Sequence, residues 1–213
     1  VSPNIKNNYK TSFEHEGEKF EFEIVRLIPR AVRSLQPDEN GTPMMELVVG
    51  TKFGMQSYYI TNKSSMFIQG MSYTLNNDAN PDTAVNFTSE KKSLFIQAPF
   101  ELSKSDMKGE TDTLITAGSK TPVKPYHWYS YGENKFVVTN FQSKGKITYI
   151  EAQKEERSAL TVLSCIMRSA NETKEVFLPV VNDQAGESVS VKIAKNHFLV
   201  SYGAVEKELP FAL

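Results

Sequence analysis

The chain has 213 residues and a formal net charge of -1, with 39% hydrophobic and 23% charged residues. These values are ordinary for a globular protein, so the composition excludes a wholly disordered chain. The Lys residues are interleaved with Glu and Asp, which argues against a nucleic-acid-binding surface and against a polybasic membrane anchor, because both need clustered cations. The sequence therefore predicts a folded protein long enough to bury a core.

Alternation of apolar and polar residues is the main pattern in the sequence. Phe20, Phe22 and Ile24 alternate with charged residues, which is typical of a strand with one face in a core and the other in water. No long stretch has the i, i+3, i+4 spacing of an amphipathic helix, and residues 154–159 fit either a short helix or a loop. In chain order, the predicted strands are Phe20–Ile24, Met44–Val49, Phe136–Val138, Ile147–Ile150, Leu160–Met167, Val176–Val180, Val189–Ile193 and Phe198–Tyr202.

Turn-forming residues separate these strands. Gly-containing or Asn-containing clusters between apolar runs are hairpin signals, and they occur at Asp38–Gly41, Gly132–Asn134 and Ala170–Thr173. The predicted fold class is therefore all-β, in the form of a mostly antiparallel, β-sandwich-like domain. Residues 103–125 are polar and irregular, and they are too many for an ordinary connection. We interpret them either as a functional loop or as the division between two β subdomains.

Two short motifs resemble catalytic or metal-binding sequences but lack the residues that normally accompany them. Ser105 and Lys108 have the Ser-x-x-Lys spacing of acyl-transfer enzymes, which requires a helix to bring the two side chains together. Asp78, Asn80 and Asp82 match the start of a calcium-binding loop, but the required Gly and Glu are replaced by Thr83 and Ser89. The sequence therefore predicts neither a catalytic residue nor a metal site.

The only cysteine, Cys165, lies in an apolar run that predicts a buried and unreactive thiol. Among the histidines, only His127 has a distinctive setting, because Tyr126, Trp128 and Tyr129 are its neighbours. An aromatic stripe around one histidine could stack on a sugar, a porphyrin or a peptide, or it could be a strand whose aromatic residues alternate between core and surface. Tyr126, His127, Trp128 and Tyr129 are thus the candidate binding residues.

The order of several segments resembles the ResB-like periplasmic domain of cytochrome c biogenesis, of the system II type. The resemblance runs nearly from end to end of the chain. The family's Tyr-Pro-Gly-Ser-like and Ser-Tyr-Ala-Ser-like segments do not occur in it, so no functional residue is carried over. In order, the resembling segments are Ile28–Ala31, Asp38–Pro43, Glu46–Val49, Tyr73–Asn77, Ala84–Asn86, Phe136–Val138, Lys144–Gly145, Glu175–Pro179, Val200–Gly203 and Glu208–Phe211.

The resemblance implies that residues 1–213 form a single extracytoplasmic β domain on the periplasmic side of the cytoplasmic membrane, with membrane anchors outside this fragment. The implied function is accessory and non-catalytic: the domain would help to position apocytochrome c or haem for covalent attachment. Its implied partners are a membrane-bound haem-handling protein and apocytochrome c, and the isolated domain is expected to hold no cofactor. Two alternatives stay open, namely a secreted β-sandwich that binds carbohydrate or protein, and a Ser/Lys hydrolase.

Overall fold

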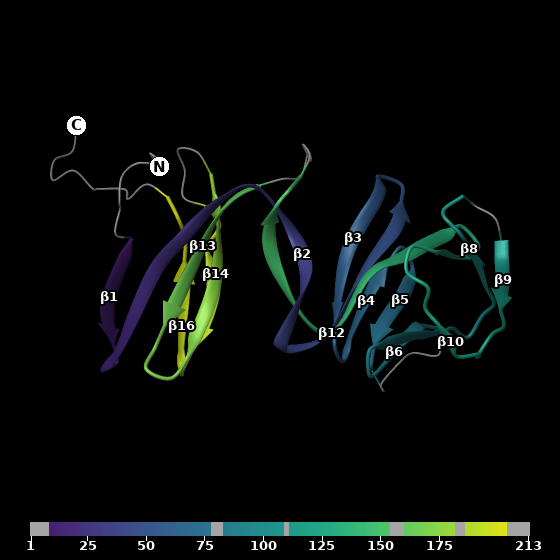
Figure 1. Cartoon of the computed structure of the whole chain (residues 1–213), viewed down its shortest axis with the longest axis horizontal. Helices are drawn as coiled ribbons and strands as arrows, with labels where there is room; N and C mark the ends of the chain where they lie inside the picture. Colours follow the sequence, from purple (N-terminus) through teal and green to yellow (C-terminus); the bar gives the residue numbers. More distant parts are fainter. Residues whose placement is uncertain (1–8, 78–82, 109–110, 154–159, 182–185, 204–213) are drawn as a thin grey trace. The chain divides into compact units, whose positions relative to one another are not determined.

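The computed structural model describes residues 9–77, 83–108, 111–153, 160–181 and 186–203, and these residues form an all-β protein with mostly antiparallel sheets (Figure 1). No helix occurs among them. The chain divides into two compact units: unit 1 comprises Val1–Arg33 and Tyr149–Leu213, and unit 2 comprises Ser34–Thr148. Two long strands, β2 (Glu18–Thr51) and β12 (Asn134–Glu151), contribute residues to both units.

Unit 1 is built on antiparallel pairs. The first part of β2 lies between β1 and β13, and β14 pairs with the other edge of β13. A separate hairpin is formed by β15 and β16. The bounds of these strands are β1 Lys10–His15, β13 Leu160–Arg168, β14 Thr173–Val180, β15 Val189–Ile193 and β16 Asn196–Val200.

The core of unit 1 explains why its strands alternate. Phe20, Cys165 and Val176 are buried on one face of the sheet, together with Val191 and Ile193 from the β15–β16 hairpin. Every second residue therefore faces the same apolar layer, as strand geometry requires. The register between β2 and β13 shifts twice, and each shift changes which face the following side chains occupy.

Unit 2 contains two sheets. In the first, β2 pairs with β3, and β12, β11, β8 and β9 are successive neighbours. The second has the order β10-β7-β6-β5-β4, in which β5 and β6 are parallel. The bounds are β3 Gly54–Thr61, β4 Ser64–Ile68, β5 Met71–Leu75, β6 Val85–Glu90, β7 Ser93–Gln97, β8 Leu102–Ser105, β9 Thr111–Ile115, β10 Thr121–Pro122 and β11 Trp128–Tyr131.

A single apolar core joins the two sheets of unit 2, as in a β-sandwich. Phe136 lies at its centre: the rings of Tyr73 and Phe87 meet it edge-on, and the ring of Tyr129 stacks on it at 5.6 Å. Because Tyr73 comes from one sheet and Phe136 and Tyr129 from the other, these ring contacts hold the two sheets together.

Most of the predicted strands are confirmed, including Phe20–Ile24, Val176–Val180 and Val189–Ile193. The strand predicted at Phe198–Tyr202 begins earlier and ends at Val200. The turns at Gly132–Asn134 and Ala170–Thr173 are also confirmed, since they join β11 to β12 and β13 to β14. Residues 154–159 and the candidate calcium-loop residues Asp78, Asn80 and Asp82 lie outside the described residues.

Two predictions about connections need correction. Asp38–Gly41 is not a hairpin turn, because β2 continues through it. Residues 103–125 are not one long loop, because they contain most of β8 and all of β9 and β10. They also lie inside unit 2, whose boundaries fall at residues 33/34 and 148/149, so the chain does not divide near 103–125.

The glycine at position 41 serves a close backbone contact. In unit 2, β2 and β12 approach so closely that a Cβ atom at Gly41 would lie 2.6 Å from the backbone nitrogen of Gly145. A Cβ atom at Gly145 would in turn lie 2.9 Å from Cδ1 of Leu35. Two hydrogen bonds link the same segments, from Asn140 Nδ2 to the Leu35 carbonyl and from Lys144 Nζ to the Glu39 carbonyl. The Asn40–Gly41 pair is therefore not a turn signal here: Gly41 lies at a strand contact that only glycine fits.

The first prediction concerns this contact. We expect Gly41→Ala to lower the free energy of unfolding by about 2 kcal/mol or more, because the new methyl group overlaps backbone atoms that cannot move aside. Gly50→Ala is the matched control: its Cβ atom would lie 3.6 Å from the Lys135 carbonyl, which is an ordinary contact. We expect this control to change stability by less than about 0.5 kcal/mol. Urea denaturation measures both, and equal stabilities would contradict the role of the contact.

Candidate binding site

The aromatic run forms β11, which lies between β8 and β12 in unit 2. Its residues alternate between the two faces of the sheet. Tyr129 is fully buried in the core, and its hydroxyl accepts a hydrogen bond of 2.8 Å from the backbone N–H of Lys124. Burial raises the pKa of Tyr129, and this hydrogen bond opposes the rise. Tyr129 is thus a core residue, and of the four predicted binding residues only the other three reach the surface.

Tyr126 and His127 precede β11. Tyr126 is exposed and has a left-handed backbone (φ 57°), while its N–H donates to the Val138 carbonyl at 3.1 Å. His127 Nδ1 lies 3.1 Å from the Pro125 carbonyl oxygen. Neither residue lines the depression into which Trp128 points, so the structure does not gather the predicted binding residues around one ligand site.

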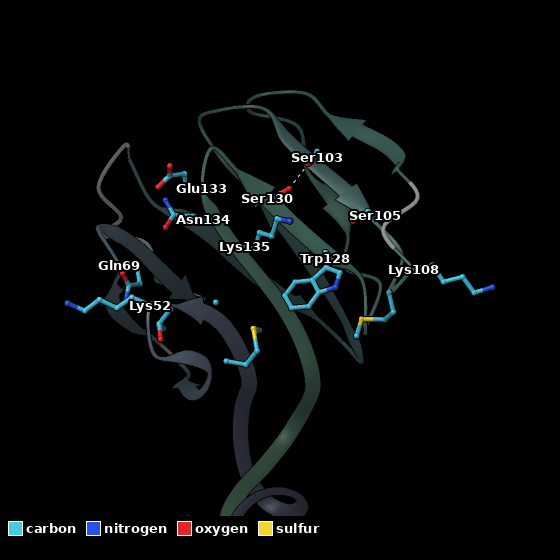
Figure 2. A pocket seen from close by; sticks show the side chains of 14 residues that line it. Lys52, Gln69, Ser103, Ser105, Lys108, Trp128, Ser130, Glu133, Asn134 and Lys135 are labelled. Carbon is cyan, nitrogen blue, oxygen red and sulfur yellow. Dashed lines mark hydrogen bonds between the residues drawn. The ribbon is translucent and has the colours of Figure 1, made fainter.

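Trp128 lines an open depression of about 960 Å³ on unit 2 (Figure 2). Its floor is the face of β8, β11 and β12 that points away from the core. The strand register places Ser105 beside Trp128 in one row, and Ser103, Ser130 and Lys135 in the next. The hydroxyl oxygens of Ser103 and Ser130 are 2.6 Å apart and hydrogen-bonded. The floor therefore combines one large aromatic surface with a row of small polar groups.

Apolar and cationic side chains surround this floor. Met55, from β3, and Met107, from the turn after β8, are 52% and 58% exposed. Three lysines also line the depression, Lys52, Lys108 and Lys135, whereas Glu133 is the one acidic residue among the described residues that line it. At neutral pH the lining thus has a formal excess of positive charge. Figure 2 shows Lys52 and Lys108 on opposite sides of Trp128.

Sequence reasoning selected Trp128 but missed the rest of the depression. The neighbours on β12 could have been found, because Gly132–Asn134 fixes a tight hairpin and a tight hairpin fixes which residues face each other. Ser103 and Ser105 could not, since their segment was interpreted as a loop. Lys52 and Met55 come from a distant hairpin, and no local pattern connects them with β11.

The Ser-x-x-Lys motif does not form a nucleophile–base pair. Ser105 is the last residue of β8, and Lys108 lies in the turn that follows, where its N–H donates to Asp106 Oδ1 at 2.8 Å. The helix that would align the two side chains is absent, and in Figure 2 the Lys108 side chain extends away from Ser105. This geometry gives the serine no activating base.

No group of three or more His, Cys, Asp or Glu side chains is arranged to hold a metal ion within the described part of the chain. In the same part, no helix has both the length and the apolar character needed to cross a membrane. Among the histidines, His15 makes a ring contact and not a metal cluster: it packs in a T-shaped arrangement with Phe198, in the aromatic cluster of unit 1.

Cys165 is fully buried in the core of unit 1, as predicted. Burial raises the pKa of its thiol from 9.0 to about 11, because the apolar surroundings disfavour the charged thiolate. The thiolate is the reactive form, so both access and ionisation oppose modification of this side chain.

The second prediction follows from this burial. At pH 8 we expect Cys165 in the folded protein to react with a soluble thiol reagent at least about a hundredfold more slowly than in guanidinium, because two pKa units reduce the thiolate fraction about a hundredfold. A cysteine placed at the exposed Ser201 in a Cys165→Ala background is the control, and it should react at once. Fast labelling of native Cys165 would show that its burial is incomplete.

Comparison with known proteins gives no family assignment: the chain matches no protein-family model, no curated protein and no solved structure.

Proposed function

We propose that this chain is a non-catalytic binding domain with the accessory function of the ResB-like proteins in cytochrome c biogenesis. In this role it helps to position apocytochrome c or haem for covalent attachment, on the periplasmic side of the membrane and beside a membrane-bound haem-handling protein. The observation that carries the proposal is the ordered set of resembling segments, from Ile28–Ala31 to Glu208–Phe211.

The positions of these segments in the fold support the proposal. Asp38–Pro43 and Lys144–Gly145 are far apart in the sequence, yet they meet at the close contact between Gly41 and Gly145. Tyr73–Asn77 and Ala84–Asn86 also meet, because β5 pairs with β6 and Thr74 Oγ1 donates to Asn86 Oδ1 at 2.9 Å. Several of the resembling segments thus contact each other in the framework of unit 2.

The proposed role uses a binding surface and not a reacting group. The described residues place no base beside Ser105, and they hold Cys165 as a buried thiol. What they offer is an open surface with an aromatic floor. Covalent haem attachment requires two partners to be held in a fixed relation, and a rigid β framework can provide such positioning without supplying a reacting group.

The second candidate function is a secreted β-sandwich that binds carbohydrate or protein. One observation favours it: Trp128, from the predicted aromatic run, does line a depression. The other aromatic residues of the run do not join it, since Tyr129 is buried and Tyr131 stacks on Phe100 at 4.0 Å. A single aromatic platform is compatible with both candidates, so a test in the cell is needed to separate them.

The third prediction provides that test. In the organism that encodes the chain, in-frame deletion of the codons for residues 1–213 should abolish covalent haem in c-type cytochromes, because the apocytochrome and haem are no longer positioned together. Haem-dependent peroxidase staining of denaturing gels measures the loss, a plasmid-borne copy should restore it, and b-type haem proteins should be unaffected. Normal c-type cytochromes in the deletion strain would refute the proposal and favour the secreted binding module.

The fourth prediction concerns haem and the isolated chain. We expect haem added to the purified protein to bind weakly or not at all, because His127 is not among the residues that line the depression. Visible absorbance measures this, with His127→Ala as the control, and the two titrations should coincide. A sharp Soret shift at stoichiometric haem that His127→Ala abolishes would place haem ligation in this chain.

A further inference from the structure

The depression around Trp128 has features that the proposed function does not use. Its floor is a sheet face on which core-facing and outward-facing residues alternate, so the residues beneath it are fixed by the core of unit 2. Tyr129 and Phe136, whose rings stack at 5.6 Å, alternate along their strands with Trp128, Ser130 and Lys135 on the opposite face. The outward-facing side chains are therefore held on a rigid platform, which is the arrangement that a binding surface needs.

The centre of the depression suits an apolar side chain. Trp128 supplies a large aromatic surface, and Met55 and Met107, both more than half exposed, line the same depression. Methionine side chains are flexible and polarisable, and they are common where a protein accepts varied peptide partners. Phe53, the neighbour of Lys52 in the sequence, is 79% exposed. Exposed apolar residues that gather in this way indicate an interaction surface.

The cationic side chains of the lining suit negative charge. Among the described residues that line the depression, Lys52, Lys108 and Lys135 are opposed by one acidic side chain, Glu133. Lys52 Nζ lies 5.0 Å from the centre of the Phe53 ring, so a cation and an aromatic side chain are presented together. An uncharged sugar would stack on Trp128 but would leave the three ammonium groups without counter-charge. A peptide with carboxylates on either side of an apolar residue would match both the apolar and the cationic side chains of the lining.

We infer that this depression binds an extended acidic polypeptide segment, with an apolar side chain against Trp128, Met55 and Met107 and with carboxylates near Lys52, Lys108 and Lys135. The inference rests on the proposed function in one respect, because it takes the domain to be a binder of polypeptide, and it adds the surface and the charge of the partner. The depression lies on the outer face of the sheet. The bound peptide therefore lies on that face and does not pair with an edge strand.

Trp128 makes the test specific, because it is the only tryptophan in the chain. The probe is a peptide of about ten residues, which spans roughly 33 Å when extended, with aspartate and glutamate flanking a central leucine and phenylalanine. Titration into the purified 213-residue protein at low salt should change the Trp128 fluorescence in a saturable way. A peptide in which lysine replaces every acidic residue should cause no change, and added salt should weaken the binding of the acidic peptide.

Charge reversal locates the site. Lys135→Glu and Lys108→Glu should each raise the Kd of the acidic peptide about threefold to tenfold, because each replaces an attraction by a repulsion. Lys195→Glu is the matched control: it makes the same change in net charge at an exposed turn of unit 1, and the Kd should stay the same. Trp128→Phe, tested by the anisotropy of a labelled peptide, should also weaken binding. Circular dichroism verifies that each variant is folded.

Three results would overturn the inference. One is no saturable change with the acidic peptide; another is equal binding of the acidic and basic peptides; the third is loss of affinity in Lys195→Glu equal to that in Lys135→Glu. If an acidic oligosaccharide such as tetragalacturonate binds and the peptide does not, the depression is a carbohydrate site. These results are separate from the test of the proposed function, since covalent haem attachment in the cell can depend on the chain whether or not this peptide binds.

Discussion

The contact between Gly41 and Gly145 is the constraint on which unit 2 depends. β2 and β12 carry the chain into and out of this unit, and at this point their backbones come closer than any side chain allows. The neighbouring hydrogen bonds from Asn140 and Lys144 reach across the same two strands. With the entry and exit strands fixed together, β11 and β8 pair onward from β12, and the two sheets can enclose one core.

The same core determines the candidate site. Because side chains alternate along a strand, every residue of β11 and β12 that packs inward fixes a neighbour that points outward. Tyr129 and Phe136 stack inside, and Trp128, Ser130 and Lys135 are thereby set on the outer face. The depression thus needs no separate scaffold. Other lining residues, such as Met55, Met107 and Lys108, lie at or near hairpin ends, where flexible side chains are common.

The sequence predicted the all-β class well because alternation is a local signal. In three segments the alternation itself identifies the buried face, and all three are strands: Phe20–Ile24, Val176–Val180 and Val189–Ile193. The prediction of a turn at Asp38–Gly41 was wrong, because Asn-Gly is typical of a hairpin. The contact of Gly41 with the distant Gly145 explains why the position needs glycine although β2 continues there. Residues 103–125 were wrongly interpreted as a loop because the outward-facing residues of β8, Ser103 and Ser105, are polar. The candidate site was half predictable: Trp128 was identified, but Lys52 and Met55 approach it only through tertiary pairing.

The division of the chain into two units has a consequence for biosynthesis. Unit 2 is one continuous segment, Ser34–Thr148, so it can acquire all its pairings soon after that segment leaves the ribosome. Unit 1 combines residues from both ends of the chain, and β13 and β14, which pair beside the start of β2, are made more than a hundred positions later. At about 5–20 residues per second this delay is several seconds. During it, the first part of β2 can pair with β1 but not yet with β13, so one edge of this strand stays unpaired.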